Sequence, residues 1–296
     1  MGMVAAAMAA LLLAPSVVSG PDALAATTHG AKAAKAPHQL PPVTVSYGPS
    51  PLQTIRVYPS SSAGAHLVVM IPGDGWRSAT NMNMQFATAK ALQTAGFAVF
   101  DTNYRGDSPS TPAFPTEIND IIAATNYAMA HSAQYGADPT KVTVLGGSAG
   151  GQLAAFSTEV MNAAVPHKVS TVVTLSGPFD FPLAIAYWAG LTGPTAAAHL
   201  GNQADALGCH PATSCPIALQ DQWSTDQHVT ATNCPARWLL MNGSAEEQPV
   251  QQADVMTAAA HAVGCNVTET IVPTTQHGFH YFTAEKATIN AFIAAG

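Results

Sequence analysis

A glycine–x–serine–x–glycine motif follows directly on a run of β-branched residues. Gly146-Gly147-Ser148-Ala149-Gly150 comes after Val142-Thr143-Val144-Leu145, and an apolar helix-like pattern comes next. A strand that turns sharply into a helix at a serine strains that serine's backbone and leaves no room for side chains beside it. The helix N-terminus also favours developing negative charge. The motif therefore predicts a nucleophilic Ser148 at the carboxyl edge of a parallel sheet; the alternative is a glycine-rich turn with an incidental serine.

Short apolar runs alternate with helical patterns along most of the chain. We expect helices at 83–95, 117–134, 150–163, 250–263 and 284–294, and strands at 43–47, 54–58, 66–72, 97–103, 141–145, 170–176, 236–242 and 268–273. This alternation predicts an α/β protein with a mostly parallel eight-stranded sheet and helices on both faces.

Residues 178–233 break the alternation and are rich in Pro, Gly, Ala and Trp. An insertion at the carboxyl end of a strand lies where ligands bind in open α/β sheets, so a short cap is one prediction. A surface excursion fits equally well. The aromatic side chains of the segment would make an apolar pocket that prefers uncharged acyl groups; they are Phe179, Phe181, Tyr187, Trp188 and Trp223. Because the segment is short for a full lipase lid, we also expect short acyl chains, roughly C2–C6.

The amino-terminal region reads as a targeting segment. Residues 4–20 are apolar and rich in Ala and Leu, and Ala23-Leu24-Ala25 is a cleavage signature. We therefore expect a signal peptide at 1–25, a flexible lead-in at 26–42, a domain at 43–296, and a secreted protein with no stable membrane span. A non-cleaved anchor and a disordered leader are the alternatives.

Charged residues make up only 9% of the chain, and the formal net charge is −7. The ten Lys and Arg residues are scattered singly. Without a basic cluster to neutralise phosphates, nucleic acid is not an expected partner.

Four cysteines in an exported chain favour two disulfides, for which three pairings exist. Cys209 and Cys215 would close a small loop. Cys234 and Cys265 each precede a predicted strand, and neighbouring parallel strands would bring them together. We expect 209–215 and 234–265. Zinc is the alternative, but these spacings match no common zinc pattern.

A serine nucleophile needs a base and a group that orients the base. In the order nucleophile, acid, histidine, the histidine follows the last strand. His277 lies there, with His280 as the alternative. The acid should follow the penultimate strand, where Glu246 is the candidate and Glu247 the second choice.

An oxyanion hole needs two backbone N–H groups aimed at the developing alkoxide. Ala149, directly after the nucleophile, would supply one. The loop Pro72-Gly73-Asp74-Gly75-Trp76 follows a buried strand, and its position predicts Gly73 and Asp74 as the donors. An ordinary β-turn is the alternative reading of that loop.

From about residue 52 to 296 the chain resembles bacterial α/β-hydrolases of the hormone-sensitive-lipase-like and BD-FAE-like esterase group. That resemblance is carried by the oxyanion loop, by Asn103-Tyr104-Arg105, by the Gly146–Gly151 motif and by His277-Gly278-Phe279. It departs from the group's pattern at Pro72 (usually His), Asp74 (usually Gly), Gly147 (usually Asp) and the glutamate acid (usually Asp).

The resemblance implies an α/β-hydrolase fold and a secreted serine carboxylic-ester hydrolase that needs no cofactor or metal. Its partner would be a small ester, held in a pocket that includes Trp76 and Phe279. An amidase or peptidase of the same fold is an alternative. A non-catalytic binding protein is another, although such proteins typically lose a triad member and this chain keeps a candidate for all three.

Overall fold

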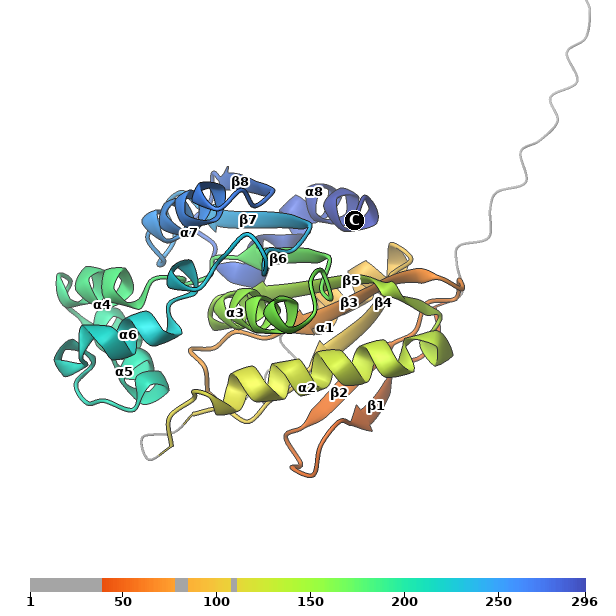
Figure 1. Cartoon of the computed structure of the whole chain (residues 1–296), viewed down its shortest axis with the longest axis horizontal. Coiled ribbons are helices and arrows are strands. Elements are labelled where there is room, and N and C mark those ends of the chain that lie inside the picture. The colour runs from red at the N-terminus through yellow and green to blue at the C-terminus, as the bar shows by residue number, and fades with distance from the viewer. Residues whose placement is uncertain (1–38, 78–84, 108–110) are drawn as a thin grey trace, which may run out of the picture. The chain divides into compact units, whose positions relative to one another are not determined.

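The structure is a computed structural model that describes residues 39–77, 85–107 and 111–296. The expected signal peptide and most of the lead-in lie outside these residues. Eight strands form one sheet in the order β1-β2-β4-β3-β5-β6-β7-β8. β1 and β2 pair antiparallel, β2 and β4 likewise, and the other neighbours are parallel. The predicted mostly parallel, eight-stranded sheet is confirmed (Figure 1).

The strands lie close to the apolar runs that predict them. Their bounds are β1 Val43–Ser46, β2 Thr54–Tyr58, β3 Ala65–Ile71, β4 Ala98–Thr102, β5 Ala137–Gly147, β6 Thr171–Leu175, β7 Arg237–Gly243 and β8 Val267–Val272. β5 begins earlier than expected and ends at the glycines before Ser148.

Five helices cover the two faces of the sheet. They are α1 Phe86–Thr94, α2 Thr116–His131, α3 Ala149–Ala164, α7 Gln251–Ala262 and α8 Phe282–Ala294. Successive residues of β3 point to opposite faces. Leu67, Val69 and Ile71 belong to the core beneath α2, α3 and α7, whereas Val68 and Met70 belong to the core beneath α1 and α8. This two-sided burial explains why β3 reads as a continuous apolar run.

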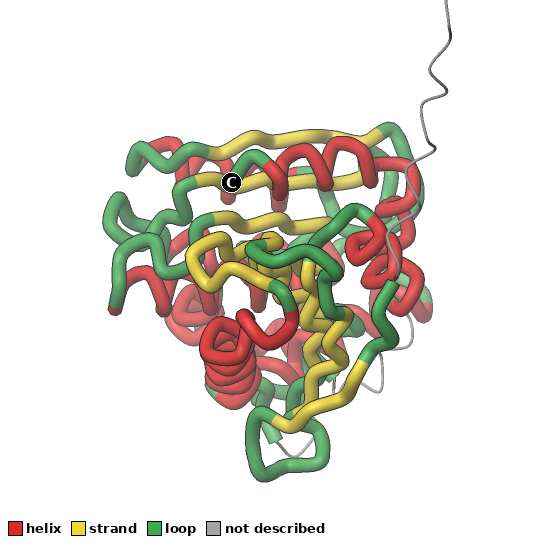
Figure 2. The backbone as a smooth tube through the Cα atoms, turned by 90° about the vertical axis from the view of Figure 1, so that its right-hand side faces the viewer, coloured by secondary structure: helices red, strands yellow, loops and turns green. Residues whose placement is uncertain are grey.

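The sheet twists strongly from one edge to the other, as Figure 2 shows. All six parallel strands end at the same edge, so the loops after β3, β5, β6, β7 and β8 converge there. Within the described ranges, no helix is long and apolar enough to cross a membrane.

Residues 178–233, here called the helical insertion, leave the sheet after β6 and return before β7. They contain α4 Phe181–Ala189, α5 Pro194–Leu207 and α6 Ile217–Trp223, with short 3₁₀ turns between and after them. These helices group at the left of Figure 1. The sequence reading found the insertion but none of its helices, because Pro and Gly interrupt it and each apolar stretch is short.

The aromatic side chains of the helical insertion are structural. Phe181 packs against Trp76 and edge-on to Phe114, and Trp223 stacks on Phe114 with ring centroids 4.8 Å apart. Phe179, Phe181 and Trp188 are at most 3% exposed. Such ring pairs add about 0.5–1.5 kcal/mol each beyond area burial. They fasten the insertion to the sheet domain.

Both disulfides join the pairs favoured by the cysteine positions. Cys209–Cys215 joins two residues of the helical insertion with a sequence separation of 6. Cys234–Cys265 joins the segments that lead into β7 and β8, with a sequence separation of 31. The neighbouring strands hold those two α-carbons 5.7 Å apart, within the range a disulfide needs.

Candidate active site

Ser148 lies at the turn between β5 and α3 with φ at 56°, a conformation that L side chains rarely adopt. Its backbone N–H donates to the carbonyl of Leu175 on β6 at 2.8 Å, which holds the turn against the sheet. A β-carbon on Gly146 would collide with the carbonyl oxygen of Gly150. The glycine spacing is therefore required by the closeness of the two backbones.

The loop after β8 lies directly beside this turn. A β-carbon on Gly147 would come 2.7 Å from the Phe279 ring, and one on Gly278 would come 3.5 Å from the Ser148 nitrogen. His277, in the same loop, lines one cavity together with Ser148. The sequence therefore brings the two predicted residues to a common site from segments far apart in the chain.

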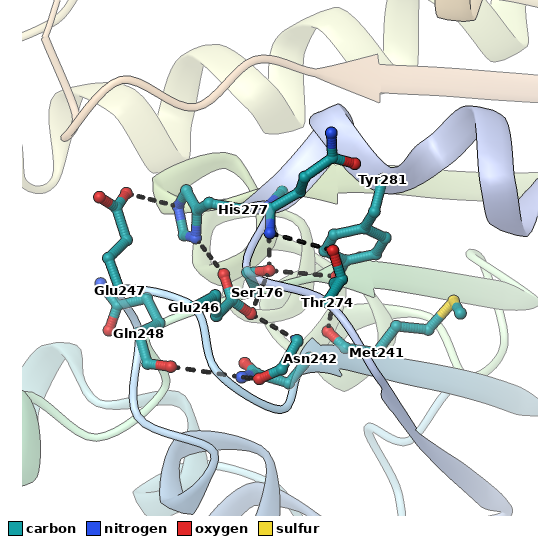
Figure 3. A network of polar contacts seen from close by, with 12 residues as sticks. Ser176, Met241, Asn242, Glu246, Glu247, Gln248, Thr274, His277 and Tyr281 are labelled. Atoms are coloured by element: carbon teal, nitrogen blue, oxygen red, sulfur yellow. Dashed lines mark hydrogen bonds and ion pairs between the residues drawn. The ribbon is translucent and has the colours of Figure 1, made fainter.

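His277 and Glu246 are joined by a short contact between Nδ1 and Oε2 (Figure 3). The Glu246 side chain is fully buried, and that of His277 is 16% exposed. A carboxylate on Nδ1 places the proton of the neutral ring there and leaves the Nε2 lone pair available as a base.

Two residues that the sequence reading missed hold Glu246 in place. Its Oε1 accepts hydrogen bonds from the Ser176 hydroxyl at 2.7 Å and from the Gly243 N–H at 2.6 Å. Ser176 also lies 3.1 Å from the Tyr281 hydroxyl, which donates to the carbonyl of Met241. Ser176 directly follows β6 and adopts φ 59°. This positive φ marks the residue in the structure, but the sequence alone does not show it.

Glu247 occupies a different position from its neighbour. Its Oε1 lies 3.4 Å from Nε2 of His277, on the other edge of the ring from Glu246 (Figure 3). Its Oε2 lies 3.6 Å from Nε2 of His199 on α5. Of the two candidate acids, only Glu246 contacts Nδ1 in the manner of an orienting group.

The loop after β3 has an unusual backbone. Asp74, Gly75 and Trp76 have φ values of 86°, 63° and 63°. A β-carbon on Gly73 would lie 2.6 Å from the Gly147 carbonyl oxygen, so this loop touches the serine turn. Ala149 is the first residue of α3, where backbone N–H groups have no acceptor within the helix. The structure thus brings the three predicted oxyanion residues together beside Ser148.

Hydrogen bonds with neighbouring elements hold the loop after β3 in place. Tyr104, fully buried, donates to the Pro72 carbonyl at 3.0 Å. The Trp76 indole N–H donates to the Gln152 side chain at 3.0 Å. Asp74 lies 4.0 Å from the Arg77 guanidinium, and its side chain is 47% exposed. Its carboxylate is thus paired at the cavity rim with a positive charge.

The cavity at this edge has a volume of about 570 Å³. Trp76 and Phe279, the two predicted pocket residues, both line it, although Trp76 is only 3% exposed. The expectation of an aromatic pocket from the helical insertion is wrong, because none of its five named rings lines the cavity, and Phe179, Phe181 and Trp188 are buried. The insertion contributes instead one face of α5, at helical spacing; its residues are Thr195, Ala198, His199, Asn202 and Gln203.

Three glutamines give the cavity wall unused acceptors. The side-chain oxygens of Gln85, Gln203 and Gln248 are buried and accept no hydrogen bond from the part of the chain that the structure describes. All three residues line the cavity. Buried amide oxygens are normally paired, so three unpaired ones in residues around one cavity are unusual.

The described residues offer no set of ligands for a metal ion. The described ranges contain no group of three or more His, Cys, Asp or Glu side chains suited to holding a metal ion.

Comparison with known proteins supports this picture at the level of fold. Esterase B from Lactobacillus rhamnosis superposes with a TM-score of 0.70 at 20% identity, covering 88% of this chain and 87% of that one. A truncated carbohydrate esterase from gut microbiota superposes with a TM-score of 0.69 at 22% identity, covering 88% and 98%. The sheet order and these likenesses show the α/β-hydrolase fold.

Two curated relatives come from Mycobacterium tuberculosis. The probable carboxylic ester hydrolase LipM is 27% identical over 40% of this chain and 28% of its own length. Esterase LipC is 26% identical over 49% of this chain and 42% of its own. The chain thus spans less than half the length of the curated relatives it matches. The family model named BD-FAE matches residues 55–258, and the chain belongs to the BD-FAE family.

Proposed function

We propose that this protein is a serine carboxylic-ester hydrolase that works through an acyl-enzyme. The observation that carries the proposal is that Ser148, at a strained turn, lines the same cavity as His277, whose Nδ1 contacts a buried Glu246. The names of the related proteins support ester hydrolysis as the reaction class.

In the proposed reaction the Ser148 hydroxyl oxygen attacks the ester carbonyl, and His277 Nε2 takes the hydroxyl proton. Glu246 stabilises the resulting imidazolium. Backbone N–H groups of Gly73, Asp74 and Ala149 stabilise the oxyanion. His277 then gives its proton to the departing alkoxide. Water, deprotonated by His277, releases the acid and restores the serine.

The cavity favours a particular kind of ester. Its wall combines polar side chains of α5 and of three glutamines with the apolar side chains of Trp76, Ala198 and Phe279. A long acyl chain gains about 0.8 kcal/mol per CH₂ only where apolar surface receives it. We therefore propose a short acyl group on an alcohol that bears further hydroxyl groups. Neighbours of the same fold include a carbohydrate esterase and an acetyl ester-xyloside bifunctional hydrolase.

Export is part of the proposal. Two disulfides are typical of oxidising compartments, and the apolar segment at 4–20 with Ala23-Leu24-Ala25 is typical of a cleaved signal. Mass spectrometry of protein recovered outside the cytoplasm should find a mature amino terminus at Ala26.

Labelling with a fluorophosphonate probe tests the reaction class, because only an activated serine reacts. The wild-type protein should be labelled at Ser148. Ser148→Ala should stay folded but should not be labelled, and its kcat should be lower by a factor of about 10⁴–10⁶. Ser214→Ala, which alters an exposed serine of the helical insertion, is the matched control and should keep both. An unlabelled wild-type protein would point to a non-catalytic binding role. Anilide cleavage that outpaces ester cleavage would point to an amidase.

The ester preference is tested by a separate panel. Acetyl esters of polyols should exceed simple alkyl acetates in kcat/KM, and p-nitrophenyl esters should peak between about C2 and C6. A maximum at C12 or longer would contradict the proposed short acyl group.

A further inference from the structure

His277 has a carboxylate on each edge of its ring. Glu246 contacts Nδ1, and Glu247 Oε1 lies 3.4 Å from Nε2. Nε2 makes no hydrogen bond within the described residues, so the contact with Glu247 is an ion-pair contact and not a hydrogen bond. The reaction proposed above uses Glu246 but leaves Glu247 without a role.

Glu247 is itself held from the helical insertion. Its second oxygen lies 3.6 Å from Nε2 of His199, an ion-pair contact longer than an ordinary hydrogen bond. The His199 ring lies flat on the Trp188 indole, with centroids 3.9 Å apart and planes 2° from parallel. Trp188 is only 3% exposed, so the stack fixes His199, and His199 in turn fixes the glutamate.

The surroundings keep Glu247 anionic. Contact with His199 has the largest effect and lowers the pKa of Glu247, partial burial opposes it, and the charges of His277 and His280 lower the pKa further. Among the described residues, Glu246 and Glu247 from the loop after β7 contact His277. The other charged or titratable groups around the same cavity are His199 from α5, His280 from its own loop, and Asp74 and Arg77 from the loop after β3.

A carboxylate at this distance acts differently on the two forms of the ring. In the neutral ring, Nε2 presents a lone pair, which offers the carboxylate no attraction. Once Nε2 has taken the Ser148 proton, the ring is a cation, and the negative charge 3.4 Å away stabilises it. An interaction that is stronger in the charged state than in the resting state accelerates the step that creates the charge.

We propose that Glu247, held by His199 of the helical insertion, is a positioning residue that stabilises the His277 imidazolium during ester cleavage. The inference rests on the proposed serine-hydrolase function. The proton passes from the Ser148 oxygen to Nε2 and then to the leaving alkoxide, while Glu247 neither takes nor gives a proton. The insertion thereby contributes to rate, and not only to the fit of the substrate.

The test measures Glu247→Gln, Glu247→Asp, His199→Gln and the Glu247→Gln/His199→Gln pair. We expect Glu247→Gln to lower kcat roughly tenfold with KM nearly unchanged, a moderate effect because the glutamate is partly solvated. Glu247→Asp should recover part of the loss. His199→Gln should lose less, and the double variant should match Glu247→Gln, because His199 acts through Glu247.

Two further readouts separate charge stabilisation from simple packing. Inactivation by phenylmethylsulfonyl fluoride needs His277 to take the serine proton but fills little of the cavity, so its rate should fall by the same factor as kcat. The acidic limb of kcat/KM should move to lower pH in Glu247→Gln, since the cation loses a partner. His210→Gln removes a histidine that pairs with Asp205 at 3.1 Å elsewhere in the insertion, and should change none of these values.

The outcomes are distinguishable. If wild-type protein resists the sulfonyl fluoride and cleaves no ester, the proposed function fails. If it reacts, but Glu247→Gln reacts equally fast and changes only KM, Glu247 is a substrate contact and the inference is wrong. If the free-energy losses of the two single variants add up in the double variant, His199 does not act through Glu247. Thermal unfolding of every variant shows whether a loss comes from misfolding.

Discussion

Gly73 packs directly against Ser148: a β-carbon on Gly73 would come within 2.8 Å of the serine β-carbon. It would also come within 2.6 Å of the Gly147 carbonyl oxygen. Backbone atoms cannot give way as the tip of a flexible side chain can. The loop after β3 and the turn after β5 therefore fix each other, and any side chain at position 73 separates the two halves of the proposed oxyanion hole.

Gly73→Ala should consequently remove most of the esterase activity. The loop must shift to make room, and loss of one oxyanion donor alone costs about 10²–10³ in kcat. Gly201→Ala is the control, because a β-carbon on Gly201 in α5 meets nothing within 4 Å. That variant should keep its activity and gain about 0.5–1 kcal/mol of stability from helix propensity. Steady-state kinetics and thermal unfolding of both proteins check the pair; equal activity would refute the packing argument.

Ser176→Ala tests the support of the acid. The change removes the hydroxyl that binds Glu246 Oε1, and it leaves the buried Gly278 N–H without its 3.0 Å acceptor. We expect a loss of about 1–3 kcal/mol in unfolding free energy and a fall in kcat of roughly tenfold. Glu246→Gln should be far worse, at about 10³–10⁴ in kcat, because the imidazole loses the carboxylate that sets its tautomer. A larger loss of kcat in Ser176→Ala than in Glu246→Gln would show that Glu246 is not the acid of the site.

The sequence predicts the sheet well because buried parallel strands carry long apolar runs such as Leu67–Ile71, whose burial on two faces leaves few other arrangements. It also predicts Ser148 and His277, since chain order and glycine spacing mark them. Ser176 escaped notice because its role depends on a backbone twist and on Tyr281, 105 residues away. The insertion's rings were misread because a sequence shows that a side chain is aromatic but not whether it faces a cavity or the core.

The two disulfides should differ in their effect on stability. In the chain-entropy model, the bridge over 31 residues contributes about 3–4 kcal/mol and the bridge over six about 2 kcal/mol. Replacing Cys234 and Cys265 with serine should therefore lower Tm more than replacing Cys209 and Cys215. Differential scanning calorimetry of both double variants measures the ranking. Non-reducing peptide mapping that found free thiols or a 215–234 link would contradict the pairing itself.

Asp107 should make the stability of the folded protein depend on pH. It is 7% exposed, and neither carboxylate oxygen accepts a hydrogen bond from the described residues. Burial, together with the nearby Asp205 and Asp74, raises the pKa of Asp107 to about 7 against the opposing charge of Arg77. An unfolded aspartate titrates near pH 4, so between about pH 4 and 7 the folded state binds a proton that the unfolded state has released.

The sign of the effect follows from that proton. The free energy of unfolding falls as the pH rises from about 4 to 7, because the buried carboxyl group of the folded state must give up its proton. Above about pH 7 the folded state bears the full penalty of a buried, charged Asp107. Asp107→Asn removes the penalty and should raise Tm at pH 8 by about 2–4 °C, the shift that roughly 1 kcal/mol gives in a domain of this size. The gain should shrink towards zero as pH approaches 4. Asp254→Asn, at an exposed position on α7, is the surface control and should raise Tm at pH 8 by less than Asp107→Asn does. A gain from Asp107→Asn that grew as the pH fell would mean that the native state holds this carboxylate ionised, and would reverse the argument.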